Sequence, residues 1–320
     1  MNRDLSSIHI PVMRERVVEM VSPTLTEPGT VFVDCTLGMG GHAEAVLRAN
    51  PNARLVGIDR DTAALDIARE RLADFADRIH LAHAVYDEFD EVLDAADIDE
   101  VDAVFFDLGV SSLQLDEAER GFSYMQDAEL DMRMDQTRGV TAADLIADLS
   151  EAELRELFYR YGDEKLAPRY AGAIVRARAE APITTTGQLV DLLQQATPAA
   201  RKNAGHPAKR VFQALRVEVN GELDALESAL PQALERVRVG GRVAVESYQS
   251  LEDRLVKRMF QLRSSSDAPR GLPVTPDQLQ PEFRLLTRGA EQAHDDEARD
   301  NPRSKPVRLR AVERIRSHSA

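Results

Sequence analysis

The sequence has no tryptophan, one cysteine and no long run of uncharged apolar residues among its 320 positions. Cys35 cannot form an internal disulfide and has no second thiolate for a zinc site, so it is expected to be a small packing residue. A spanning helix needs about 18 consecutive apolar residues, which excludes a membrane span. The first residues carry charges where a signal peptide has an apolar core, so a cytoplasmic protein is expected.

Basic residues are fewer than acidic ones. The chain has 40 Lys and Arg and 55 Asp and Glu, which gives a net charge of −15. This excludes a protein that coats nucleic acid with its whole surface. Two segments are less acidic than the rest of the chain. Residues 139–220 have 11 basic and 10 acidic side chains, and residues 299–320 have seven basic and two acidic side chains. Contact with a polyanion is therefore expected at these two segments.

Short apolar runs alternate with amphipathic stretches in the first third of the chain. Strands are predicted at residues 30–35, 53–59, 78–85 and 101–108. The stretches between them predict helices. Because the apolar runs are continuous rather than alternating, both faces of the strands should be covered, as in a doubly wound parallel sheet.

From about residue 140 the pattern becomes purely helical. Thr141 is suited to cap a helix that extends to Gly162, and further helical stretches continue to residue 210. This predicts three parts: residues 1–138 as the first part of an α/β domain, 139–210 as a helical insert for substrate recognition, and 211–320 as the second part with a basic C-terminal segment.

The second part is predicted to complete the sheet. A long helix is expected over residues 211–238, then a strand over 241–248. Two late strands near residues 282–290 and 307–315 have only a polar, proline-containing segment between them. An antiparallel closing pair is therefore expected.

The segment Asp34 to His42, DCTLGMGGH, places a glycine-rich turn between a strand and a helix. Glycines let the backbone approach a ligand closely, and amides at a helix start can face an anion or a carboxylate. Asp59 ends the next predicted strand, 21 residues after Gly38, where a carboxylate suits the hydroxyls of an adenosine ribose.

These features leave the cofactor open. Gly38, Gly40 and Ala43 satisfy the GxGxxA form of the dinucleotide fingerprint, so an NAD-dependent oxidoreductase is an alternative. Asp34 beside the turn suits the amino acid end of S-adenosylmethionine, the sheet is predicted to end in an antiparallel pair, and no acid and base for hydride transfer are evident. Methyl transfer is favoured.

The segment Asp107 to Asp116, DLGVSSLQLD, follows the fourth predicted strand, where substrate and cofactor should meet in an open α/β sheet. Asp107 can accept hydrogen bonds, Ser111 offers a hydroxyl, and Gln114 can both donate and accept. Such a loop could hold a nucleobase edge or an adenine. His9, His42, His206 and His294, four of the seven histidines, show no ligand spacing, so no metal is expected.

Several long motifs together resemble the bacterial RsmH or MraW family, which methylates the exocyclic N4 of a cytosine in 16S ribosomal RNA. The similarity extends from His9 to about Ile315. The motifs are DCTLGMGGH, GIDRD, DLGVSSLQLDEAERGFSYMQDAELDMRMD, YGDEKLAPRYAGAIV, PAKRVFQALRVEVNGEL, SLEDRLVKRMF and NPRSKPVRLRAVERI.

The resemblance implies a class I (Rossmann-like) methyltransferase sheet with an inserted all-helical subdomain, S-adenosylmethionine as donor, and cytosine 1402 of 16S rRNA, within the small ribosomal subunit, as acceptor. It implies cofactor contacts for seven residues: Gly40, Gly41 and His42 at the amino acid part, Asp59 at the ribose, Tyr86 near the adenine, and Asp107 with Gln114 completing the pocket. The chain departs from the family pattern at Tyr248 and Gln249, where Phe-His is usual.

An exocyclic amine can be methylated without a cysteine nucleophile, because orienting N4 and accepting its proton are enough. Asp107 is the expected acceptor, and Ser111 is the next candidate. A non-catalytic RNA-binding or ribosome assembly factor on the same fold is the other alternative. The presence of the glycine turn, Asp59 and the Asp107 loop in one chain argues against such a factor, because a protein that only binds RNA does not require all three.

Overall fold

The computed structural model describes residues 11–201, 205–266 and 280–317. The chain forms two compact units. We call Met1–Gly109 with Asp224–Ala320 the sheet unit and Val110–Leu223 the helical unit. The insert expected over residues 139–210 lies inside the helical unit, which begins earlier and ends later than that range.

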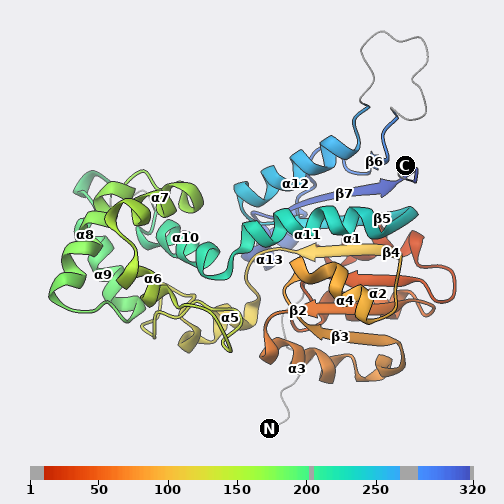
Figure 1. Cartoon of the computed structure of the whole chain (residues 1–320), viewed down its shortest axis with the longest axis horizontal. Coiled ribbons are helices and arrows are strands. Elements are labelled where there is room, and N and C mark those ends of the chain that lie inside the picture. Colours follow the sequence, from red (N-terminus) through yellow and green to blue (C-terminus); the bar gives the residue numbers. More distant parts are fainter. Residues whose placement is uncertain (1–10, 202–204, 267–279, 318–320) are drawn as a thin grey trace. The chain divides into compact units, whose positions relative to one another are not determined.

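The sheet unit is built on seven strands in the order β3-β2-β1-β4-β5-β7-β6 (Figure 1). The first five strands of the order are parallel, and β7 is antiparallel to both of its neighbours. The strands are β1 (Val31–Asp34), β2 (Arg54–Asp59), β3 (Ile79–His83), β4 (Val101–Asp107), β5 (Val237–Ser247), β6 (Phe283–Leu285) and β7 (Arg308–Arg314). The predicted fold class and its antiparallel closing pair are confirmed.

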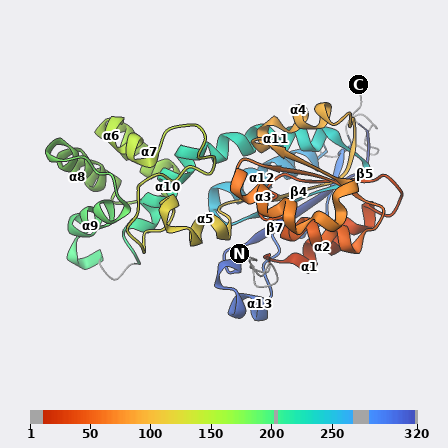
Figure 2. The same ribbon diagram turned by 90° about the horizontal axis from the view of Figure 1, so that it is seen from below.

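Helices cover both faces of the sheet, as the continuous apolar runs predicted. The helices are α1 (Arg14–Val21), α2 (Gly41–Ala49), α3 (Thr62–Arg71), α4 (Phe89–Ala95), α11 (Glu222–Arg236), α12 (Ser250–Arg263) and α13 (Asp295–Asp300). Buried side chains of α1, α2 and α3 pack on one face, and those of α4, α11 and α12 pack on the other. Figure 2 shows α4 and α11 on one side of the strands and α1 and α2 on the other.

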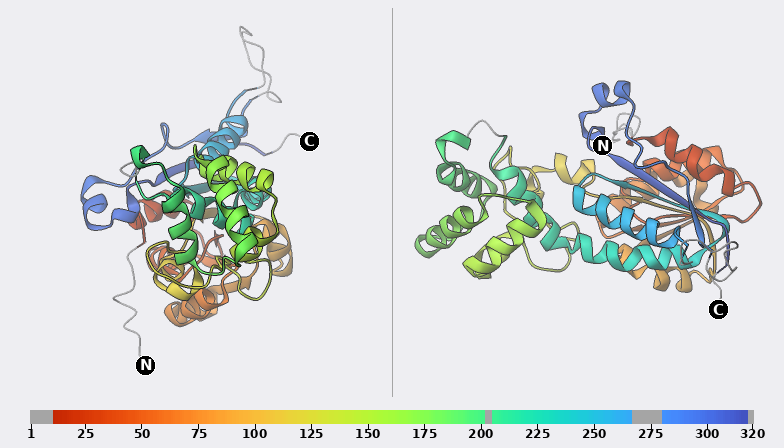
Figure 3. Two further views of the ribbon diagram at one scale, coloured as in Figure 1. Left: turned by 90° about the vertical axis from the view of Figure 1, so that its left-hand side faces the viewer. Right: turned by 90° about the horizontal axis from the view of Figure 1, so that it is seen from above.

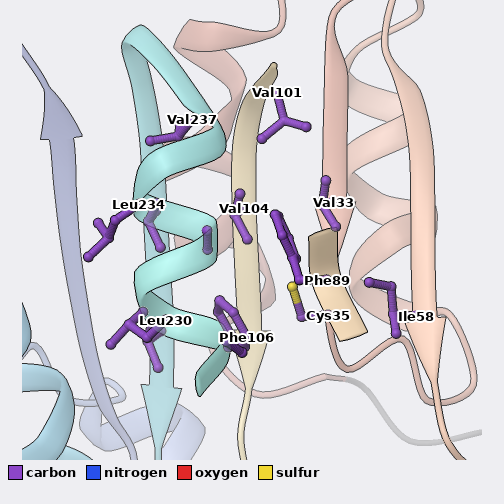
Figure 4. Close-up of a cluster of buried hydrophobic side chains, with 14 of the residues drawn as sticks. Val33, Cys35, Ile58, Phe89, Val101, Val104, Phe106, Leu230, Leu234 and Val237 are labelled. Atoms are coloured by element: carbon purple, nitrogen blue, oxygen red, sulfur yellow. The ribbon is translucent and has the colours of Figure 1, made fainter. Parts of the chain in front are cut away.

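The core under α4 and α11 includes Cys35, which is 1% exposed and lies among Val33, Phe89 and Phe106 (Figure 4). The expected packing role of the cysteine is therefore confirmed. Burial also raises the pKa of its thiol well above the ordinary value, which keeps the sulfur protonated.

The helical unit, coloured from yellow through green to blue-green in Figure 3, contains no strand among its described residues. Its helices are α5 (Ser112–Asp116), α6 (Ala142–Asp148), α7 (Glu151–Gly162), α8 (Ala167–Glu180), α9 (Thr186–Ala196) and α10 (Ala208–Asn220). Thr141 caps α6 as predicted, but the single helix expected up to Gly162 is wrong. Leu149 is extended and Ser150 caps a new helix by accepting the Glu153 amide, so the chain breaks into α6 and α7.

The long helix predicted over residues 211–238 is also wrong. It consists of α10 and α11, which are separated at Gly221. Gly221 is left-handed, with φ 58°, and its amide closes the end of α10. The helical periodicity is the same on both sides of this residue and therefore does not reveal the break. Within the described residues no helix combines the length and apolar character that crossing a membrane requires.

The loop between α5 and α6 is held onto α10 by side chains that bond its backbone. Asn220 accepts from the Met134 amide at 2.8 Å and donates to the Met132 carbonyl at 2.8 Å. The buried Arg120 guanidinium donates to the Met134 carbonyl at 2.7 Å. Gly121 lies in this loop with φ 74°, and a Cβ there would collide with the Glu129 carbonyl.

We therefore expect Gly121→Ala to destabilise the protein by about 2 to 4 kcal/mol, since it adds left-handed strain to a backbone collision. Urea unfolding measures the change. Gly221→Ala is the matched control, because Gly221 is also left-handed but has no atom within 4 Å of the position that an added methyl group would take. The control should cost about 1 kcal/mol. Equal losses in the two variants would contradict the collision.

Candidate functional site

The turn after β1 brings the glycine motif to the carboxyl edge of the sheet. Gly40 is the N-cap of α2 and is left-handed, with φ 77°. Gly41 is required for a different reason, because a Cβ there would lie 2.5 Å from the Pro11 ring. Gly38 is left-handed as well, with φ 52°, and a Cβ there would lie at an ordinary contact distance of 3.8 Å from the Thr36 carbonyl oxygen. The glycines therefore shape the turn and its packing.

Asp59 ends β2 and is tied to the turn. Its Oδ2 accepts the Gly38 amide at 2.6 Å and its Oδ1 accepts the Asp61 amide at 2.8 Å. Burial raises the pKa of Asp59 to about 6 despite these two donors. The sequence predicted both the turn and Asp59, and the structure brings them into direct contact.

Asp34 is the second acid at this edge and is 1% exposed. Its Oδ1 accepts the Thr36 amide at 3.2 Å. Burial raises the pKa of Asp34 to about 7, and the nearby Asp107 and Asp59 add to the rise while His42 opposes it. Asp34, Asp59, Asp107 and His42 are thus electrostatic neighbours in the sheet unit.

These raised pKa values affect the stability of the folded chain. A carboxyl whose pKa is higher in the folded chain than in the unfolded chain stabilises the fold less as pH rises from its ordinary pKa of 3.8 toward its pKa in the folded chain. The unliganded protein therefore loses stability as pH rises through about 4 to 7. A cationic ligand that favours the ionised carboxylates would offset this loss.

Asp107 at the end of β4 is the centre of a buried cluster of polar side chains. Its Oδ1 accepts from the Tyr248 hydroxyl at 2.9 Å, and its Oδ2 lies 3.6 Å from Nε2 of His42. The same Tyr248 hydroxyl lies 3.4 Å from Oε2 of Glu246. A ring nitrogen of His42, a carboxylate oxygen of Asp107 and a carboxylate oxygen of Glu246 all lie within 4.8 Å of one another. We call these four residues the acid cluster.

Sequence reasoning missed Glu246 and gave Tyr248 no role. A carboxylate inside the apolar run VAVES was the available signal. The expectation that the histidines show no ligand arrangement rested on spacing along the chain. The tertiary structure places His42 beside two carboxylates, at distances where the three side chains could hold a small cation.

Tyr86 lies in the short 3₁₀ turn Tyr86–Glu88 after β3. Its ring is half-buried, contacts Phe106 edge-on at 5.8 Å, and has the Arg60 guanidinium 5.8 Å above its centre. An aromatic ring there can pack against a planar base.

Ser111 and Gln114 belong to the helical unit, where they form the cap of α5. The Ser111 hydroxyl accepts the Gln114 amide at 3.3 Å, and Oε1 of Gln114 accepts the Ser111 amide at 3.0 Å. Both groups therefore have a structural task in the local chain. Their predicted roles in cofactor binding and proton transfer stay predictions.

The basic residues expected to contact RNA have mixed surroundings. Arg303, Lys305 and Arg308 are exposed. Arg310 forms an ion pair with Asp253 at 2.8 Å, and Arg314 is 6% exposed and donates to backbone carbonyls. In the helical unit Lys209 and Arg210 are exposed, whereas Lys202 and the side chain of Arg201 lie outside the described part of the chain.

Relatives of this chain share its full length. A methyltransferase of Leifsonia xyli named ribosomal RNA small subunit methyltransferase H is 62% identical over 310 residues, 97% of this chain and 95% of its own. One of the same name from Clavibacter sepedonicus is 61% identical over 316 residues, 99% of each chain. A third, from Thermobifida fusca, is 58% identical over 309 residues, 96% of this chain and 94% of its own.

The family model described as the MraW methylase family matches residues 6–315. The match therefore includes every residue of the glycine turn, the Asp59 edge, the acid cluster and the α5 cap. The chain belongs to the MraW methylase family.

Proposed function

We propose that this protein transfers a methyl group from S-adenosylmethionine to the exocyclic N4 of cytosine 1402 in 16S ribosomal RNA, within the small ribosomal subunit and in the cytoplasm. The chain is a ribosomal RNA methyltransferase, as its relatives are named. The base and atom are the finer part of the proposal. They rest on the motif resemblance and on the chemistry available at Asp107.

The acidic side chains at the carboxyl edge of the sheet favour S-adenosylmethionine over NAD as the cofactor. The Gly38 amide, which would face a pyrophosphate in a dinucleotide site, donates instead to Asp59. Asp34 and Asp107 add acidic groups to the same unit. Two phosphates would meet these acids at close range, whereas S-adenosylmethionine brings a sulfonium and an ammonium. This favours the methyl donor over NAD.

The residues of the sheet unit fit the parts of this cofactor. Gly40, Gly41 and His42 would hold its amino acid part, where both ring nitrogens of His42 are buried without a hydrogen-bond partner in the described residues. Asp59 would accept from the ribose hydroxyls and Tyr86 would pack near the adenine. The bound cofactor supplies an electrophilic methyl group.

Asp107 would complete the pocket and accept the proton of the methylated amine. Its side chain is 29% exposed, so a substrate can reach it, while its Oδ1 is already paired with Tyr248. Its Oδ2 lies 3.6 Å from Nε2 of His42, beyond hydrogen-bond distance, and a carboxylate oxygen in this position is suited to orient an amine and take its proton. Gln114 as a cofactor contact and Ser111 as a second acceptor remain part of the proposal.

The helical unit and the C-terminal segment would contact the RNA. Exposed Arg303, Lys305 and Arg308 support this for the C-terminal segment, and exposed Lys209 and Arg210 support it for the helical unit. Phosphate contacts by Lys and Arg make binding depend on salt. Arg310 and Arg314 are less suited, because the sheet unit already uses their guanidinium groups.

Calorimetry and rRNA mass spectrometry test the proposal together. We expect S-adenosylmethionine to bind and NAD to show no heat, since the acid edge favours a cationic ligand. Small subunits from a deletion strain, incubated with the protein and the methyl donor, should gain one methyl group on N4 of cytosine 1402. Binding of NAD alone would restore the oxidoreductase alternative. Binding of neither cofactor would favour an assembly factor.

A further inference from the structure

Glu246 lies beside Asp107 because of the register between two parallel strands. The two residues are direct partners in the β4–β5 pairing, so their side chains project from the same face of the sheet. Glu246 is 0% exposed, and its Oε1 has no hydrogen-bond partner among the described residues. A buried carboxyl without an ion pair is costly, so its presence requires an explanation beyond packing.

The Tyr248 hydroxyl connects the two carboxyls. It lies 2.9 Å from Oδ1 of Asp107 and 3.4 Å from Oε2 of Glu246. A hydroxyl has one proton to donate. Both contacts can therefore be hydrogen bonds only if one carboxyl is ionised and accepts from Tyr248 while the other is protonated and donates to the Tyr248 oxygen. The backbone holds Tyr248 in place, because its amide donates to Oε2 of Glu252 at 2.9 Å.

The surroundings decide which carboxyl carries the proton. Burial, then the charge of Asp107 and that of Glu297 on α13, raise the pKa of Glu246 well above its usual range. Asp107 is the more exposed of the two carboxyls. Also near the pair are Tyr248, which follows β5, the His42 ring on α2, and Asp34 at the end of β1, which interacts electrostatically with Asp107. Two adjacent carboxyls that share one proton titrate as a unit.

We propose that protonated Glu246 and Tyr248 position Asp107 for proton removal: Glu246 donates to the Tyr248 oxygen, and Tyr248 donates to Oδ1 of Asp107. Oδ2 of Asp107 is then left to face the amine. This inference rests on the proposed function and adds two positioning residues to it. The chain of donors fixes the orientation of the Asp107 carboxylate.

The step balances with the groups named. The amine nitrogen uses its lone pair to form the bond to the methyl carbon, and the electron pair of the broken carbon–sulfur bond goes to sulfur. The nitrogen then has one proton in excess, which Oδ2 of Asp107 accepts. Asp107 is partly exposed and returns the proton to water when the product leaves. Glu246 and Tyr248 keep their own protons throughout.

Single-turnover methylation of small subunits at saturating methyl donor tests the arrangement across pH 5.5 to 9. Glu246→Gln keeps a neutral donor toward Tyr248, so its rate should stay within about threefold of the parent. Glu246→Ala and Tyr248→Phe should each lose about tenfold or more. Tyr248→Phe removes the hydrogen bond to the charged Asp107, and Glu246→Ala removes the donor that orients the Tyr248 hydroxyl toward it. Tyr248→Phe should also change the shape of the pH profile, because it removes the hydroxyl that links Asp107 to Glu246, whose pKa is raised.

Controls separate this inference from the proposed function and from loss of folding. Ser247→Ala removes a hydroxyl of the same strand that contacts the Arg308 carbonyl, and should leave rate and profile unchanged. Calorimetry with the methyl donor and thermal unfolding establish that each variant is folded. A parent protein that neither binds the donor nor methylates would refute the proposed function itself.

Three results would overturn the positioning role in a protein that methylates. The first is a Glu246→Gln variant that binds the donor but is inactive, since Glu246 would then act as an anion. The second is a Tyr248→Phe profile identical to that of the parent. The third is inactivation by EDTA with recovery on adding Zn²⁺ or Mg²⁺, which would mean that the acid cluster holds a metal ion.

Discussion

Asp107→Asn is expected to slow methyl transfer at saturating S-adenosylmethionine by about a hundredfold to ten-thousandfold, the range that a general base contributes. The amide keeps the shape of the side chain and can still accept from the Tyr248 hydroxyl, so the local fold should persist. It cannot take a proton from the amine. The loss should therefore appear in the single-turnover rate.

The surface variant Asp66→Asn is the control, because it removes an exposed carboxylate of α3 that forms an ion pair with the exposed Arg69 at 2.6 Å. Its rate should match that of the parent. If Asp107→Asn kept more than a tenth of the parental rate, the proton would have to leave by another route. Ser111 would then be the next residue to replace.

Asp59→Ala is expected to weaken binding of S-adenosylmethionine ten- to a hundredfold, a loss of roughly 1.5 to 3 kcal/mol, because hydrogen bonds to a charged acceptor are removed. The turn also loses the acceptor of the Gly38 amide. Calorimetry measures the affinity. Asp59→Asn should fall between the parent and Asp59→Ala, since its amide oxygen can still accept one donor.

The pH dependence of this binding follows from the pKa of about 6 at Asp59. The ionised carboxylate accepts hydrogen bonds and favours a cationic ligand, so affinity should fall as pH drops through about 6. Near that pH, binding should release protons. Asp59→Ala should bind with a weaker pH dependence. Affinity that rises as pH falls would contradict the assigned role of Asp59.

Local sequence patterns determined the framework of the protein. The apolar runs that end at Asp34, Asp59 and Asp107 specify strands whose carboxyl ends must share one edge if the sheet is parallel. The glycine turn follows from residues that tolerate left-handed backbone. These features depend on neighbours a few residues apart, so one sequence is enough to find them.

Helix ends that fall inside a continuous run of helical periodicity were not predicted from the sequence. The breaks at Ser150 and Gly221 leave the apolar spacing on either side intact, and capping decides them. Likewise, the start of the helical unit at Val110 depends on which residues pack together rather than on composition. Such boundaries are set by contacts that a linear pattern does not contain.

Only the tertiary structure decided the acid cluster. The spacing between Asp107 and Glu246 along the chain carries no information about their contact, because the helical unit lies between them in sequence. The register of β4 against β5 makes them partners, and the start of α2 brings His42 to the same place. The sequence determined which strands end in acids. The pairing of β4 with β5 decided that one of these acids, Asp107, lies beside the buried Glu246, whose pKa rises because burial and a neighbouring charge both disfavour its ionised form.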